Sequence, residues 1–179
     1  MPSARVASRY AKSLFELARD TEKLEVVHRD ISLISRTFGA NRNLGLMLLN
    51  PVIRYDYKLR ILQRVFQKQI SDLTSRFLEI LSRKGRAELL PEICTAFTKF
   101  YYDQKGLVVA QVTGAVPLDD EIKSQLSEYV RKYTGKEVLL EEKTEDDLIG
   151  GFVLRVGDRR LDSSISGMLR QLKKEFRGK

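Results

Sequence analysis

Histidine, cysteine and tryptophan are almost absent from this sequence, which has one histidine, one cysteine and no tryptophan among 179 residues. Catalytic triads and tetrahedral metal sites are built mainly from histidine and cysteine, so His28 and Cys94 leave almost nothing from which to assemble either. A single cysteine also excludes a disulfide within the chain. We therefore assign no catalytic residue, no cofactor-binding residue and no metal ligand, and we expect no cofactor.

Long apolar runs are absent as well. The longest hold about four to six residues, whereas a membrane-spanning helix needs about 20. The N-terminus lacks the apolar core of a signal peptide. The sequence therefore predicts a protein that is not inserted in a membrane and that stays in the compartment where it is made.

The two rare side chains have ordinary structural interpretations. Cys94 lies between the apolar residues Ile93 and Phe97, which predicts a small buried thiol rather than a nucleophile. His28 lies next to the apolar stripe of a predicted helix, and we expect it on the surface.

The formal net charge is +8, and its distribution is uneven. Residues 1–105 hold 19 basic residues (lysine and arginine) and 11 acidic residues (aspartate and glutamate). Residues 106–179 hold 13 basic and 13 acidic residues. Basic residues on the polar faces of helices are usually solvated. A basic helical module that binds nucleic acid is nevertheless the alternative function that this asymmetry leaves open.

The pattern of apolar residues predicts six short helices in residues 1–105 with brief connections and no strand. Such a pattern favours a compact antiparallel bundle. The expected helices cover about residues 3–20, 22–38, 44–49, 56–66, 72–84 and 86–105.

Two of these helices have unusually wide apolar stripes. On the first, the stripe covers about 180° of the helix, and on the fifth about 160°, where a single packing contact needs about 100°. The width of the first stripe has two interpretations, which the sequence does not separate. Either part of it is left for a partner helix, or the helix lies between two neighbours in the bundle.

The spacing of apolar residues changes at Gly106 from a helical repeat to an alternation of strand and helix patterns. The expected order is a strand over 107–116, a helix from Asp119 to Gly135, strands over 137–142 and 152–156, a turn at Gly157-Asp158, a short strand and a final helix. Asp162 is expected to cap the final helix, and Ser163 and Ser164 are also suited to that end. This order predicts a second domain over residues 106–179, a small sheet covered on one face by two helices. The fold class is therefore α+β, mostly α.

Seven residues near the C-terminus form a pattern of turn formers and cap residues: Leu148, Ile149, Gly150, Gly151, Gly157, Asp162 and Ser164. Taken alone, they indicate only local structure. Together they resemble the C-terminal signature of the F-type ATP synthase delta subunit family, the bacterial counterparts of the mitochondrial oligomycin sensitivity-conferring protein. The segment from Arg9 to Phe15 is similar to the opening helix of that family, and Gly85-Arg86 resembles a join between two of its helices.

The resemblance implies a non-catalytic subunit of the peripheral stalk, or stator, which links the catalytic head to the membrane sector during proton-coupled ATP synthesis. It implies that residues 1–105 bind alpha-subunit N-termini of the head and that residues 106–179 bind the b-subunit stalk, with no nucleic acid and no direct membrane insertion. The residues to which it assigns the groove for an alpha-subunit helix are Tyr10, Ala11, Leu14, Phe77 and Ile80.

The start of the chain bears on its location. No extension precedes the segment that resembles the family's first helix, which indicates a bacterial cytoplasmic protein or a mature organellar form. We expect a peripheral subunit at the cytoplasmic face of the bacterial inner membrane.

Overall fold

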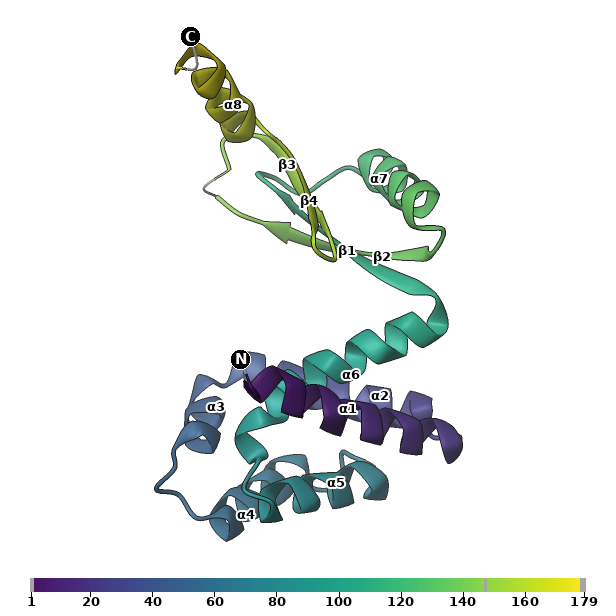
Figure 1. Cartoon of the computed structure of the whole chain (residues 1–179), viewed down its shortest axis with the longest axis vertical. Coiled ribbons are helices and arrows are strands. Elements are labelled where there is room, and N and C mark those ends of the chain that lie inside the picture. The colour runs from purple at the N-terminus through teal and green to yellow at the C-terminus, as the bar shows by residue number, and fades with distance from the viewer. Residues whose placement is uncertain (1, 147, 178–179) are drawn as a thin grey trace. The chain divides into compact units, whose positions relative to one another are not determined.

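The computed structural model describes residues 2–146 and 148–177. The chain divides into two compact units, Met1–Tyr101 and Tyr102–Lys179, which we call the helical unit and the α/β unit. Helices predominate, and the α/β unit contains a four-stranded sheet (Figure 1), so the fold is α+β and mostly α. The division falls within the last helix of the N-terminal region, a few residues before the boundary predicted at Gly106.

Each helix predicted in residues 1–105 is present among the described residues, whereas their antiparallel arrangement as a bundle stays a prediction. A short 3-10 turn before the last helix was not predicted. The elements are α1 (Pro2–Asp20), α2 (Leu24–Ala40), α3 (Arg42–Leu49), α4 (Tyr55–Phe66), α5 (Asp72–Arg83), η1 (Ala87–Leu89) and α6 (Leu90–Lys105).

Local signals explain where several of these helices begin and end. The side chain of Asn41 accepts a hydrogen bond from the Leu44 amide and caps α3, which therefore starts two residues before its predicted position. Gly85, just after α5, has a φ of +64°. That left-handed conformation, which glycine adopts without steric cost, is typical of a helix end.

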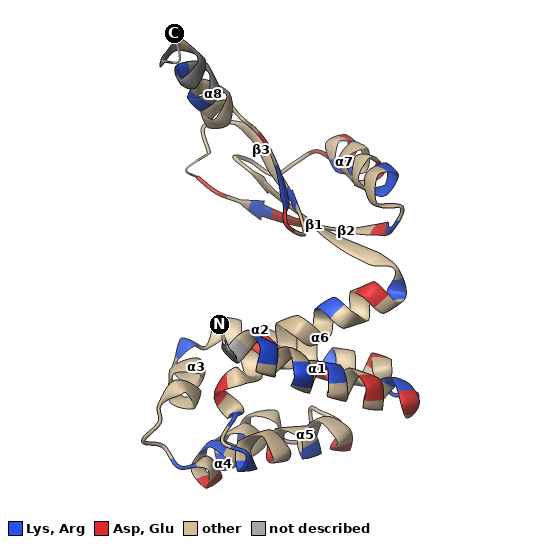
Figure 2. Cartoon of the chain, in the orientation of Figure 1, with Lys and Arg blue, Asp and Glu red and all other residues tan. Residues whose placement is uncertain are grey.

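Aliphatic and aromatic side chains from all six helices fill the core of the helical unit. Phe15 of α1 packs edge-on against Phe97 of α6, with ring centroids 5.9 Å apart. Most charged residues lie outside this core, with Asp30 and Lys58 as buried exceptions. Figure 2 shows lysine and arginine residues along α1 and α4. The buried apolar residues include Ile31, Ile34, Leu48, Leu62, Phe66, Leu81, Leu90 and Ile93.

A buried carboxylate joins α2 to the start of α5. Asp30 is 4% exposed, and its Oδ2 accepts hydrogen bonds from the Ser71 amide at 2.8 Å, the Ser71 hydroxyl at 2.6 Å and the Thr74 hydroxyl at 2.7 Å. Ser71 is the residue that caps α5. Because a buried charge is tolerated only when it is hydrogen-bonded, these three bonds fix the start of α5 against α2.

The α/β unit contains β1 (Leu107–Gly114), α7 (Asp120–Thr134), β2 (Glu137–Thr144), β3 (Gly151–Val156), β4 (Arg159–Ser164) and α8 (Ile165–Arg177). The strand order is β2-β1-β3-β4. Strands β1 and β2 are parallel and are joined by α7, whereas β3 pairs antiparallel with both β1 and β4. The tight turn predicted at Gly157-Asp158 joins β3 to β4.

Helix α7 covers one face of this sheet (Figure 1). Leu126 and Val130 of α7 pack with Ala110, Val112 and Leu154 of the strands, and all five are buried. Asp119 occupies the N-cap position of α7 as predicted, but its side chain makes no capping hydrogen bond.

Glu142 of β2 holds the start of α7 instead. Its carboxylate accepts a hydrogen bond from the Leu118 amide at 2.6 Å and pairs with Lys123 at 2.8 Å. These bonds, the one to Lys123 first, lower the pKa of Glu142.

The expectation that two helices cover one sheet face is correct for α7 and wrong for α8. The described apolar side chains of α8 are exposed: Ile165 is 45%, Met168 56%, Leu169 49% and Phe176 82% exposed. Helix α8 continues directly from β4, and in Figure 1 it extends beyond the end of the sheet. Its apolar stripe is therefore not part of the core of the α/β unit.

We predict that Asp30→Ala lowers the free energy of unfolding of the full chain by about 3 kcal/mol, because the Ser71 amide and two hydroxyls lose a buried charged acceptor. Urea unfolding followed by circular dichroism measures the change. The control is Asp20→Ala, which removes only an exposed pair with Arg19 and should cost less than about 0.5 kcal/mol. Equal losses in the two variants would show that the Asp30 bonds do not stabilise the unit.

Candidate partner-binding faces

The apolar stripe of α1 is used mostly for packing inside the helical unit. Ala11 and Leu14, two of the predicted groove residues, are 0% and 2% exposed. Tyr10 is partly buried, and Leu17 on the same stripe is 52% exposed. Neighbouring helices therefore account for most of the stripe's width, and Tyr10 and Leu17 keep accessible apolar surface on it.

The stripe of α5 is divided in the same way. Leu78 and Leu81 are buried, Phe77 is partly buried, and Ile80 is 54% exposed. Helix α2 contacts both α1 and α5, so the two predicted faces belong to helices that share one neighbour. Of the five groove residues inferred from the family resemblance, Ile80 is thus the most exposed.

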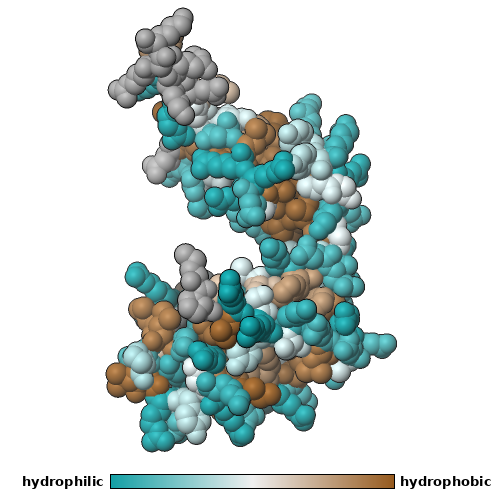
Figure 3. All heavy atoms as spheres, in the orientation of Figure 1, coloured by the Kyte–Doolittle hydropathy of each residue, from teal (hydrophilic) through white to brown (hydrophobic). Residues whose placement is uncertain are grey.

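A third apolar surface lies where α2, α3 and α6 meet. Leu46 and Leu49 of α3 are 53% and 64% exposed, and with Phe38 and Pro91 they line a hollow of about 410 Å³. Figure 3 shows apolar residues gathered over α3 and the loop after it. The sequence alone did not reveal this hollow, because α6, which closes it with Pro91, is distant in the chain from α2 and α3.

Gly150 and Gly151 of the C-terminal signature lie where β3, β4 and α8 come closest together. Gly151 has a φ of +79° and stands opposite Ser164 in the strand ladder, and a Cβ at this position would overlap the carbonyl oxygen of Ser163. A Cβ on Gly150 would lie 2.8 Å from the side chain of Ile165. The Gly150 carbonyl also accepts a hydrogen bond from the Ile165 amide at 3.0 Å. Close approach of backbones therefore requires glycine at position 151, whereas at Gly150 an added Cβ would meet only the end of the Ile165 side chain.

Of the three residues considered as caps of the last helix, Ser164 rather than Asp162 is the one whose side chain caps α8. Strand β4 includes Asp162, and the Ser164 hydroxyl accepts a hydrogen bond from the Gly167 amide at 3.0 Å. Asp162 in turn accepts bonds from the Ser164 hydroxyl at 2.5 Å and the Ser164 amide at 3.2 Å. These bonds, the hydroxyl's first, lower the pKa of the Asp162 carboxyl.

An exposed apolar surface adjoins β4 on the α7 side. Tyr129 and Tyr133 of α7 are 56% and 55% exposed, and Leu161 of β4 is 44% exposed. They line a cavity of about 200 Å³ with Arg159, whose guanidinium lies 4.9 Å from the centre of the Tyr133 ring. With the bare stripe of α8, the α/β unit thus has two apolar surfaces that its own described residues leave exposed.

The two rare side chains differ in how well they were predicted. Burial raises the pKa of the Cys94 thiol to about 12, so the thiolate does not form near neutral pH and the expected buried thiol is confirmed. His28 was expected at the surface, but it is partly buried and its ring stacks on Tyr101 with centroids 3.7 Å apart. In the described part of the chain, no group of three His, Cys, Asp or Glu residues is placed to hold a metal ion.

Exposed apolar residues on amphipathic helices are typical of a protein that binds other proteins through helix faces. Both units have such faces, at Leu17 and Ile80 in the helical unit and at Met168 and Leu169 in the α/β unit. Within the described residues, no helix has both the length and the apolar character needed to cross a membrane.

Comparison with known proteins identifies the family. The model of the ATP synthase delta (OSCP) subunit family matches residues 6–176. The chain is 37% identical to the ATP synthase subunit delta of Christiangramia forsetii, over 99% of this chain and 96% of that one. It is 36% identical to that of Chlorobaculum parvum, over 97% and 96%. A solved Toxoplasma gondii mitochondrial ATP synthase hexamer contains a chain of similar fold, with a TM-score of 0.74 and 22% identity over 95% of this chain and 96% of that one.

The chain belongs to the ATP synthase delta (OSCP) subunit family. It is therefore a non-catalytic subunit of the peripheral stalk of the F-type ATP synthase, as the resemblance of its C-terminal signature and opening helix implied.

We predict that Gly151→Ala destabilises the α/β unit by about 3 kcal/mol, because it adds a clash with the Ser163 carbonyl to an unfavourable positive φ. Hydrogen exchange of the β3 and β4 amides measures the loss. Gly157→Ala is the matched control, since Gly157 has a φ of +57° with nothing near its Cβ position. It should cost only about 1 kcal/mol. If both variants lost the same stability, backbone strain alone would explain the effect and the close approach would be irrelevant.

Proposed function

We propose that α1–α6 act as a six-helix antiparallel bundle that binds the N-terminal helices of the alpha subunits of the catalytic head. The exposed apolar residues of α1 and α5 support this assignment, above all Ile80 at 54% and Leu17 at 52% exposed. Tyr10 and Phe77 contribute their partly buried rings, and the buried Ala11 and Leu14 form the floor beneath them in our proposal. An amphipathic helix binds such a surface through its own apolar residues.

We further propose that the α/β unit binds the C-terminal end of the b-subunit stalk through α8. The observation that supports this is the apolar stripe of α8, in which Ile165, Met168 and Leu169 are each about half exposed and Phe176 is 82% exposed. A partner helix laid along α8 would bury this stripe, which no described part of the α/β unit covers.

The two contacts together would let the protein resist torque. Rotation of the central shaft drags the head with it unless a second connection holds the head to the membrane sector. A well-packed interface of about 1,600 Å² can dissociate slowly enough to outlast a catalytic turnover. Attachment at two places adds resistance, since a released contact rebinds at high effective concentration.

Such a role sets the location. A subunit that holds both the alpha subunits and the b stalk lies where head and membrane sector meet. We therefore propose a peripheral position at the cytoplasmic face of the bacterial inner membrane.

We predict that Ile80→Asp weakens binding of a synthetic alpha-subunit N-terminal peptide to the full chain at least tenfold, because the interface would bury an unpaired carboxylate. Fluorescence anisotropy measures the dissociation constant, and circular dichroism confirms that the variant is folded. Leu14 is unsuitable for this test, since its side chain is in the core.

Two further variants serve as controls for this prediction. Val52→Asp, at a position 85% exposed after α3, should leave affinity unchanged. If Leu46→Asp rather than Ile80→Asp abolished binding, the peptide would occupy the hollow beside α3 and the groove assignment would be wrong.

We predict that Met168→Asp weakens binding of a peptide from the C-terminal end of the b subunit about tenfold or more, for the same reason. Val116→Asp is the control, because Val116 is 67% exposed and lies in the loop after β1. Isothermal titration calorimetry measures both affinities. Normal binding by the Met168 variant would exclude α8 as the docking face.

A further inference from the structure

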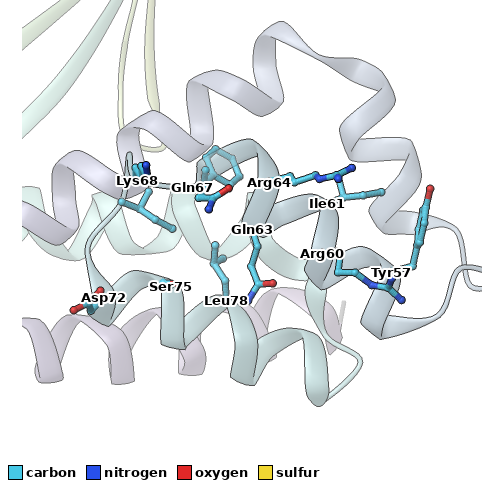
Figure 4. A pocket seen from close by; sticks show the side chains of 12 residues that line it. Tyr57, Arg60, Ile61, Gln63, Arg64, Gln67, Lys68, Asp72, Ser75 and Leu78 are labelled. Carbon is cyan, nitrogen blue, oxygen red and sulfur yellow. The ribbon is translucent and has the colours of Figure 1, made fainter.

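A hollow of about 720 Å³ lies between α4 and α5 (Figure 4). Its walls come from one face of α4, the loop after it and the facing side of α5. Figure 4 shows Tyr57 and Arg60 at one end of the hollow and Lys68 and Asp72 at the other. None of the proposed alpha-subunit contacts lies in this lining.

Three cationic side chains line the hollow at a spacing of four residues, namely Arg60, Arg64 and Lys68. All three are exposed. The described ion pairs of α4 and α5 join Arg54 to Asp56 and Arg83 to Glu79, so none of the three cations forms an ion pair with a described carboxylate. Asp72, at the start of α5, is the acidic residue in the lining.

This arrangement is unfavourable for the isolated protein. Arg60 and Arg64 are four residues apart on α4, a spacing at which like charges on a helix repel one another. Lys68 adds a second cost, because its φ of +64° places a residue with a long side chain in the left-handed region. A bound group of opposite charge would offset the repulsion.

The remaining walls are not those of a simple anion site. Tyr57 is 55% exposed and, with Ile61 and Leu78, gives the hollow an apolar floor and rim. Gln63 and Gln67 add amide groups able to bond a peptide backbone. The hollow is far larger than one phosphate, and its mixture of apolar, amide and cationic groups fits a peptide segment with both carboxylate and aliphatic side chains.

We propose that the hollow between α4 and α5 is a second docking site of the helical unit, and that it binds an acidic amphipathic helix. Four residues of an α-helix advance about 6 Å. A partner helix alongside α4 with carboxylates every fourth residue would therefore place one near each of Arg60 and Arg64. Lys68, in the loop after α4, would face the same acidic partner from the end of the hollow. The aliphatic residues of the partner helix would contact Tyr57 and Ile61. This site is separate from the proposed alpha-subunit face on α1 and α5.

The test uses the full chain and a 16-residue capped peptide that repeats the unit Glu-Leu-Ala-Ala four times, with a matched peptide carrying glutamine for glutamate. We expect saturable binding of the glutamate peptide alone, with amide NMR shifts concentrated in α4 and α5. The double variant Arg60→Glu, Arg64→Glu should weaken binding at least tenfold. Arg29→Glu with Arg36→Glu, the same charge change at exposed positions of α2, should alter it less than twofold.

Other results would overturn the proposal. Equal weakening by the two double variants would show general charge attraction rather than a site. Equal binding of the glutamine peptide, or shifts outside α4 and α5, would do the same. Tighter binding of tripolyphosphate or of an RNA oligonucleotide at these residues would assign the hollow to phosphate groups instead. Ile80→Asp should leave binding of the glutamate peptide intact, which keeps this test independent of the alpha-subunit face.

Discussion

The amphipathic helices of this protein have to satisfy two demands with one stripe of apolar residues. On α1 and α5 the residues that stabilise the fold alternate along the same stripe with residues left bare, as Leu14 and Leu17 show on α1. Burying the whole stripe would give a more stable unit with nothing to offer a partner. The wide stripes are therefore divided between the core and the surface rather than given to either alone.

Apolar surface left exposed contributes no burial free energy to folding. Hydrogen bonds between helices and strands supply part of the stability that is missing there. Asp30 fixes the start of α5 through three short bonds, and Glu142 ties the start of α7 to β2. At the C-terminal signature the backbones themselves meet, which only Gly151 allows without a clash. Such hydrogen bonds fix the position of a helix or strand through a few atoms at its end. The outer face of the helix or strand stays free for other contacts.

Periodicity predicted most of the secondary structure, because the long helices and most of the strands follow one hydrophobic repeat, whereas β4 has only one apolar residue and was predicted from the turn before it. Periodicity was less informative where distant residues decide the outcome. The buried role of Asp30 depends on Ser71, 41 positions later, and the stacking of His28 on Tyr101 is equally remote in sequence. The placement of α8 was also mispredicted. The sequence pattern of an apolar stripe is the same whether the helix packs on a sheet or exposes the stripe to a binding partner. For the candidate faces, the sequence marked the stripes of α1 and α5, but exposure of Ile80 and burial of Leu14 required the structure.

The direct continuation of β4 into α8 determines how a mechanical load would enter the α/β unit. A force applied to α8 along the strand direction passes into β4 at Ser164. Strand β4 pairs with β3 from Gly151↔Ser164 to Val156↔Arg159, so this load acts parallel to the strands and is shared by all the pairs at once. A ladder sheared in this way must break its bonds together, whereas one peeled from an end breaks them singly. The connection is thus suited to steady tension.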